Sequence, residues 1–171
     1  MKFEIDVSGY DIFSKDYVIC ISGEGSIVKG FKFKKELIET IINNWHKQKY
    51  GYRDFGKEIA LFKVKLYCVI IYYLFKSIGL KERVSLTICR DFYRHKNDIN
   101  NTLRYLLEKK LGIQIGSPLH QRLPNSSEAH RYAKLMHNDT LNKLTTSVDI
   151  NLEDIEKFLR RFVFKRYKKH K

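Results

Sequence analysis

The sequence has no apolar segment long enough to cross a lipid bilayer. Its longest apolar run, VKLYCVIIYYLFKSI at residues 64–78, is short and carries Lys65 and Lys76. The N-terminal segment MKFEIDVSGY alternates like a strand and lacks the apolar core of a signal peptide. We therefore expect a cytoplasmic protein that does not associate with membranes.

Cysteine, proline and glycine are scarce. The three cysteines, Cys20, Cys68 and Cys89, each stand in an apolar run, and no Cys or His pair has the spacing of a zinc site. This pattern favours buried, reduced thiols. Only two prolines and nine glycines occur among 171 residues, which leaves little sequence for flexible linkers. No P-loop, GxGxxG or zinc motif is present.

Basic residues exceed acidic ones, and the excess is uneven along the chain. The net charge is +14, from 33 Lys and Arg against 19 Asp and Glu. The last 15 residues, KFLRRFVFKRYKKHK, hold eight of the bases and no acid, so residues 1–156 carry only +6. Aromatic residues alternate with the bases in this tail. Such a segment suits contact with a nucleic acid, whose phosphates attract the charges and whose bases stack on the rings.

The hydrophobic pattern predicts a mixed α/β fold. Period-two or β-branched segments predict strands at residues 2–8, 17–22, 26–33 and 83–89, with a short strand within 113–123. Helical periodicity and capping signals predict helices at 34–50, 57–78, 96–112, 126–144 and 151–166. The first three strands form an antiparallel meander. The helical crossover then places the fourth strand beside the first and parallel to it, in a sheet flanked by helices.

An acidic residue stands near the end of two of these strands. Asp6 lies in EIDVSG on the first strand, and Asp91 follows the fourth in LTICRDF. Parallel neighbours lie about 4.8 Å apart, so the two acids meet at one edge of the sheet. Their carboxylates repel unless a cation or a proton lies between them, which predicts a divalent-cation site. The alternatives are a turn-capping role for Asp6 and, for Asp91, pairing with Arg90 or Arg94 or capping of the next helix.

This pattern resembles the ribonuclease H-like superfamily of nucleases. The residues that carry the resemblance are IDVSG, an acid on the first strand before a small polar turn, and TICRDF, an acid at the end of the fourth. The predicted strand order agrees, and the resemblance covers roughly residues 3–140. It implies an RNase H-like domain over residues 1–150. Residues 151–171 then form a basic C-terminal helix or tail, packed on that domain or extending from it.

The resemblance also implies a third acid near the start of the crossover helix and a fourth ligand on a later helix. Glu58 in FGKEIALF is the first choice for the third acid, and Glu36 in FKKELIE is its rival. The segment NSSEAHRYA resembles the late-helix motif, with His130 where the family usually has an Asp. Glu128 and Asp139 are the other candidates. A histidine ligand suits Mn²⁺ better than Mg²⁺.

The function implied by the resemblance is metal-dependent hydrolysis of phosphodiester bonds in an RNA/DNA hybrid or a structured nucleic acid. Asp6, Glu58, Asp91 and His130 would be the catalytic residues, with Mg²⁺ or Mn²⁺ as cofactor. The alternative is a catalytically inactive module that keeps the fold and binds nucleic acid. Under either hypothesis the backbone-binding candidates are Lys57, Arg90, Arg122, Arg160, Arg161, Lys165 and Arg166.

Overall fold

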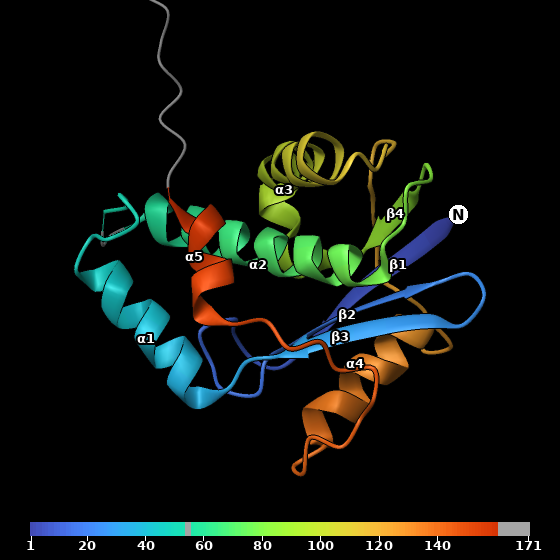
Figure 1. The fold of residues 1–171 in the computed structure, drawn as a ribbon, viewed down its shortest axis with the longest axis horizontal. Coiled ribbons are helices and arrows are strands. Elements are labelled where there is room, and N and C mark those ends of the chain that lie inside the picture. Colours follow the sequence, from blue (N-terminus) through green and yellow to red (C-terminus); the bar gives the residue numbers. More distant parts are fainter. Residues whose placement is uncertain (54–55, 161–171) are drawn as a thin grey trace, which may run out of the picture.

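The fold is built on a five-stranded sheet with the spatial order β3-β2-β1-β4-β5 (Figure 1). The structure is a computed structural model that describes residues 1–53 and 56–160. Its strands are β1 (Lys2–Ser8), β2 (Val18–Gly23), β3 (Ile27–Lys32), β4 (Ser85–Ile88) and β5 (Leu119–His120). The first three form the predicted meander, because β2 pairs antiparallel with both β1 and β3.

Helices cover both faces of this sheet. The α-helices are α1 (Lys35–His46), α2 (Lys57–Ile78), α3 (Lys96–Leu103), α4 (Glu128–Asn138) and α5 (Leu152–Leu159). A 3₁₀ segment, η1 (Arg90–His95), precedes α3, and a π-helical segment, η2 (Arg104–Leu111), continues it. The predicted class, an α/β protein with a mixed sheet flanked by helices, is confirmed.

The fourth strand lies where the crossover argument placed it. β4 runs parallel to β1, with Ile88 in register with Ile5. Parallel neighbours need a long connection because the first strand ends at the opposite edge from the start of the second. Here α1 and α2 supply that connection. β5 then pairs parallel with β4, so the short strand predicted within residues 113–123 is also confirmed.

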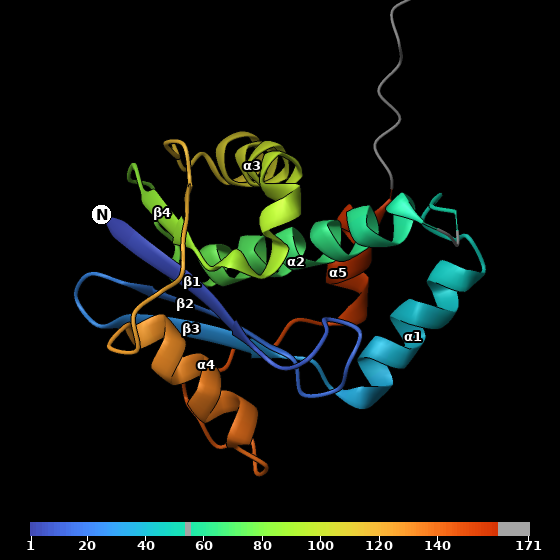
Figure 2. The same cartoon turned by 180° about the vertical axis from the view of Figure 1, so that it is seen from behind.

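The two faces of the sheet pack against different helices. Figure 2 shows α2 on one side and α4 on the other. Ile5 belongs to the main core with α2, whereas Cys20 lies in a smaller cluster with Ala133 and Met136 of α4. Side chains alternate between faces along a strand, and Asp6 is opposite Cys20 in the register. Asp6 therefore lies on the face that α4 covers.

Capping residues mark the ends of helices at three places. Gly79 ends α2 in the left-handed conformation, with φ of 73°, which a glycine adopts without a steric penalty. The Ser127 hydroxyl accepts a hydrogen bond from the backbone N–H of His130 at the start of α4. The Asn151 side chain does the same for Asp154 at the start of α5. These caps satisfy amides that the first helical turn leaves without a partner.

Three predicted helices were too long, and the first of them, α1, ends at His46 rather than residue 50, before the left-handed Gln48 with φ of 57°. Helix α4 ends at Asn138 rather than 144, because the Asp139 carboxylate accepts a hydrogen bond from the backbone N–H of Leu144 and closes a turn. The following residues run beside β3, where the N–H of Gly30 donates to the carbonyl of Thr146. The last helix ends at Leu159, and the part predicted beyond residue 160 lies outside the described residues.

The apolar run at residues 64–78 belongs to α2, a helix whose side chains are buried from Val64 to Phe75 in the protein core. Across residues 1–53 and 56–160, no helix is long and apolar enough to span a membrane. The predicted buried, unpaired state of Cys20, Cys68 and Cys89 is confirmed.

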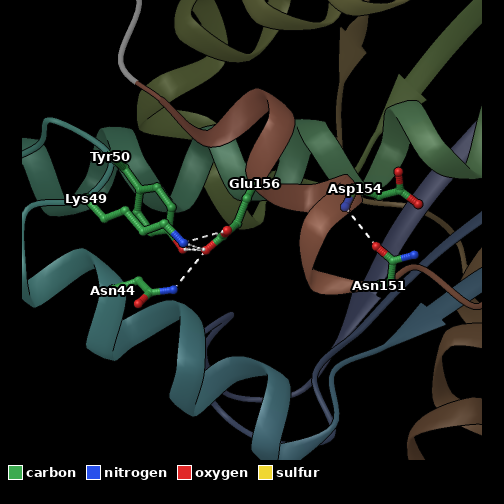
Figure 3. Close-up of polar contacts among 6 residues, drawn as sticks. All are labelled: Asn44, Lys49, Tyr50, Asn151, Asp154 and Glu156. Atoms are coloured by element: carbon green, nitrogen blue, oxygen red, sulfur yellow. Dashed lines mark hydrogen bonds and ion pairs between the residues drawn. The ribbon is translucent and has the colours of Figure 1, made fainter.

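Helix α5 is anchored by one carboxylate as well as by apolar packing. Figure 3 shows Glu156 accepting hydrogen bonds from Asn44 Nδ2, Lys49 Nζ and Tyr50 Oη, at 2.8, 2.7 and 2.6 Å. The preceding residue, Ile155, is fully buried in the main core. These contacts tie the C-terminal helix to α1 and to the loop that follows it.

The Glu156 contacts predict a pH-dependent contribution to stability. Burial alone raises the pKa of Glu156, but the hydrogen bonds from Lys49, Tyr50 and Asn44 outweigh it, so its pKa is lowered. A carboxylate of this kind stabilises the fold above its unfolded pKa of 4.5 and loses the effect as pH falls through the folded value. We expect Glu156→Gln to reduce the free energy of unfolding at pH 7 by about 1 kcal/mol, with a smaller difference below about pH 4.

Thermal denaturation at both pH values measures this difference. The matched control is Glu39→Gln, which removes the same charge from an exposed pair with Lys35 at 3.8 Å. An exposed pair of this kind contributes little, so the control should melt close to the wild type. Equal melting temperatures for wild type and Glu156→Gln at pH 7 would contradict the anchoring role.

Candidate metal centre

Asp6 and Asp91 meet at the carboxyl-terminal ends of two parallel strands. The backbone N–H of Cys89 donates to the carbonyl of Ile5, so the chain still runs beside β1 after β4 ends. It then turns into η1, whose first turn holds Asp91. Ligand atoms of Asp6, Cys89 and Asp91 all lie within 4.8 Å of one another. Within the described part of the chain, they are the one group of three or more potential metal ligands this close together.

The two carboxylates differ in their surroundings. Asp6 is buried, with 6% of its surface exposed, because α4 covers its face of the sheet. Asp91 is exposed at the start of η1. This arrangement combines a rigidly held oxygen donor with one that solvent and a ligand can reach.

His130 lies next to Asp6. Its Nδ1 is 2.7 Å from Asp6 Oδ2, and the imidazole itself is partly exposed. Ser127 caps the same helical turn, so the start of α4 fixes the position of this histidine. The structure thus brings together Asp6, Asp91 and His130, three of the residues that the sequence singled out. His130 contacts Asp6 and does not belong to the three-residue group.

The carboxylates line an open pocket of about 460 Å³. Two of the predicted backbone-binding residues, Arg90 and Arg122, line it as well. Its full lining is Asp6, Val7, Cys89, Arg90, Asp91, Arg122, Leu123, Asn125 and His130. The pocket therefore combines carboxylates that suit a cation with guanidinium groups that suit a phosphate.

The surroundings of the carboxylates disfavour additional negative charge. Burial raises the pKa of the Cys89 thiol, and the charges of Asp91 and Asp6 raise it further, so the thiol is neutral at pH 7. Burial also raises the pKa of Tyr17 and of Tyr67, and the charge of Asp91 adds to both. The buried hydroxyl of Tyr67 has no hydrogen-bond partner within the described residues. A cation between Asp6 and Asp91 would relieve their repulsion.

The donor set fits a hard divalent cation. Two metal–oxygen bonds of about 2.1 Å join oxygens up to about 4 Å apart, and the ligand atoms of this group lie within 4.8 Å of one another. Mg²⁺ and Mn²⁺ prefer carboxylate oxygens and need only one or two of them when a substrate phosphate completes the coordination. A protonated thiol is a poor ligand, because the thiolate is the form that binds metals.

The other predicted ligands lie elsewhere in the structure. The Glu58 carboxylate, in the first turn of α2, accepts a hydrogen bond from the backbone N–H of Arg53. Glu36 is exposed in the first turn of α1, and Glu128 lines a different pocket from that of Asp6. Asp139 closes the turn after α4. None of these four belongs to the group around Asp6.

Sequence reasoning missed Cys89 as a neighbour of the carboxylates. We assigned it to the core from its apolar context, and it is indeed buried. Cys89 directly follows the last residue of β4 and precedes Asp91 by two residues. This position in the chain is the signal that could have placed it at the edge of the sheet.

Two further backbone-binding candidates, Lys57 and Arg160, are not among the residues that line the pocket. Lys57 is the exposed first residue of α2, and Arg160 is exposed just after α5. Arg161, Lys165 and Arg166 lie outside the described residues.

The strand order and the flanking helices are consistent with an RNase H-like fold. Searches of protein-family models, curated proteins and solved structures find no match to this chain. The fold and the site therefore define a class on physical grounds: an α/β protein with a carboxylate pair at the edge of a mixed sheet.

Proposed function

We propose that this protein is a divalent-metal-dependent nuclease of the RNase H-like type, which hydrolyses phosphodiester bonds in a hybrid or structured nucleic acid. The observation that carries the proposal is the proximity of Asp6 and Asp91, with ligand atoms within 4.8 Å, at the carboxyl-terminal ends of two parallel neighbouring strands. A pair of carboxylates at this edge of an α/β sheet occupies the usual position of a ligand site.

Each residue of the pocket has a role in this proposal. Asp6 and Asp91 would hold Mg²⁺ or Mn²⁺. When bound, the cation supplies Lewis-acid activation of water and stabilises charge on the leaving oxygen. His130 restrains the orientation of Asp6 through its 2.7 Å contact. Arg90 and Arg122 would bind the phosphates on either side of the reacting bond, as guanidinium groups do at such sites.

The third-ligand hypotheses remain part of the proposal. Glu58 and Glu36 are the predicted additional acids, although neither lies in the group around Asp6. Two carboxylates suffice for an Mg²⁺ that also coordinates substrate phosphate. The other candidates, Lys57, Arg160, Arg161, Lys165 and Arg166, would then bind the backbone beyond the pocket, in a salt-dependent manner.

One observation favours the alternative, a module that binds nucleic acid without cleaving it. The third member of the group is a neutral cysteine, and His130 already contacts one oxygen of Asp6. Such a module would keep the fold and the basic surface while lacking a complete ligand set.

A cleavage assay with wild-type protein tests the proposal. Labelled RNA/DNA hybrid, double-stranded DNA and four-way junction are incubated with Mg²⁺ or Mn²⁺, and calorimetry measures metal binding separately. We expect cleavage of at least one substrate, with loss of all cleavage in EDTA. Salt-sensitive binding without cleavage would instead establish the binding module. Absence of both metal binding and nucleic-acid binding would overturn both functions.

A further inference from the structure

Exposed aromatic side chains are rare in this protein. The sequence contains 11 Tyr, 11 Phe and one Trp. Within residues 1–53 and 56–160, Tyr10 and Tyr93 are the aromatic residues among the exposed large apolar side chains, at 100% and 46% exposure. All other aromatic rings of this part are buried or half-buried.

Each exposed tyrosine comes shortly after one of the two acids of the carboxylate pair. Tyr10 comes four residues after Asp6, and Tyr93 comes two residues after Asp91. A chain spans at most about 3.6 Å per residue, so the two Cα atoms lie within about 14 Å and 7 Å of those of the respective acids. Because β1 and β4 are parallel, both exposed rings come after the carboxyl-terminal ends of these strands, at the edge of the sheet where the carboxylate pair lies.

The backbone around Tyr10 is held in place although its ring is free of the core. Gly9 has φ of 129°, and a Cβ there would approach Tyr17 to 2.9 Å, so this position requires glycine. On the other side, Asp11 forms an ion pair with Lys63 of α2 at 2.6 Å. The loop is thus anchored before and after Tyr10, and the tyrosine points into solvent.

Two cationic side chains lie close to the ring of Tyr93. The guanidinium of Arg90 is 5.5 Å from the centre of its ring, and Lys96 Nζ is 5.3 Å from it. Its neighbour Phe92 packs on Tyr67, with ring centres 4.9 Å apart, which holds η1 against the core. The result is an exposed ring on a rigid turn, with two positive charges that suit phosphates.

We propose that Tyr10 and Tyr93 stack on unpaired bases beside the carboxylate pair, so that this site takes a single-stranded segment of nucleic acid. The inference rests on the proposed function in that the ligand is a nucleic acid. Stacking on a protein ring requires a base with a free face, and bases inside a continuous duplex have none. The substrate class is therefore a single strand, or the unpaired part of a flap or loop.

Fluorescence anisotropy in EDTA tests this inference without any need for cleavage. The probes are a labelled single-stranded DNA of about 12 nucleotides, within the usual site size, and the same strand in a blunt duplex. We expect wild type to prefer the single strand. Tyr10→Ala and Tyr93→Ala should each weaken single-strand binding about five- to hundredfold and leave duplex binding nearly unchanged. The Tyr→Phe variants, which keep the ring, should bind like wild type.

Two controls separate stacking from other effects. Leu141→Ala removes a side chain that is 68% exposed elsewhere on the surface, and it should not affect binding. The slope of log affinity against log salt concentration should stay unchanged in the tyrosine variants. This slope depends on the number of phosphate contacts and not on the number of stacked bases. The inference is overturned if both alanine variants bind the single strand like wild type, or if they weaken both probes equally. Single-strand preference without metal-dependent cleavage would overturn the nuclease and leave the stacking intact.

Discussion

Asp91→Asn is expected to lower metal-dependent cleavage on the order of a thousandfold while leaving the fold intact. Asp91 is exposed at the start of η1, so an asparagine of the same shape does not disturb the core. The substitution removes one of the two negative charges that would hold the cation. Metal ions contribute several kcal/mol of charge stabilisation in such reactions, and each 1.36 kcal/mol corresponds to a tenfold change in rate. Initial rates with Mg²⁺ and Mn²⁺ measure the effect.

The matched control for this prediction is Asp98→Asn. Asp98 is an exposed acid on the next helical turn, paired with His95 at 3.3 Å, and its substitution changes the net charge by the same amount. We expect it to cleave like wild type. Calorimetry should show weaker Mn²⁺ binding for Asp91→Asn alone. Wild-type cleavage by Asp91→Asn would exclude the carboxylate pair as the reacting centre.

The second large effect concerns a lysine inside the core. Lys65 on α2 is only 4% exposed, and burial lowers its pKa to about 8. The charged form is therefore less favourable in the folded than in the unfolded protein, by about 3 kcal/mol. We expect Lys65→Met, which keeps a similar volume without the charge, to raise the free energy of unfolding at pH 7 by about that amount.

The pH dependence of this gain provides a sharper test. Between the folded pKa of about 8 and the unfolded value of 10.5, the unfolded state binds more protons at Lys65 than the folded state does. Wild-type stability from this group therefore rises with pH across that window. The advantage of Lys65→Met should be greatest at or below pH 8 and should shrink toward pH 10.5. Urea denaturation of both proteins at several pH values measures it, and a constant difference would rule out the titration of Lys65 as its source.

The short-range features of the fold were predictable from sequence. The alternation of residues 2–8 marks β1, and the long apolar run with a glycine after it marks α2 and its end. Each of these signals acts within a few residues, because backbone periodicity and capping are local. The parallel placement of β4 beside β1 also followed, since the handedness and length of a crossover leave few choices.

The contacts of the site were only partly predictable. The approach of Asp91 to Asp6 followed from the strand order, because both acids stand at strand ends. The contact between His130 and Asp6 depends on where α4 packs across the sheet, and the sequence suggested it only through a family resemblance. The position of Glu58 depends on where α2 begins relative to the sheet edge. No local sequence pattern determines how far Glu58 lies from the carboxylate pair.

The sequence by itself thus determined the class of fold, the central pair of parallel strands and the two acids near their ends. The tertiary structure decided which side chains join them: a buried cysteine, a histidine from the helix that covers Asp6, and two exposed tyrosines beyond the strand ends. The physical reason is the distance along the chain over which each interaction acts. Periodicity and capping depend on neighbours in the chain, whereas a binding site depends on the packing of helices far apart in sequence, which small shifts in their position and rotation change.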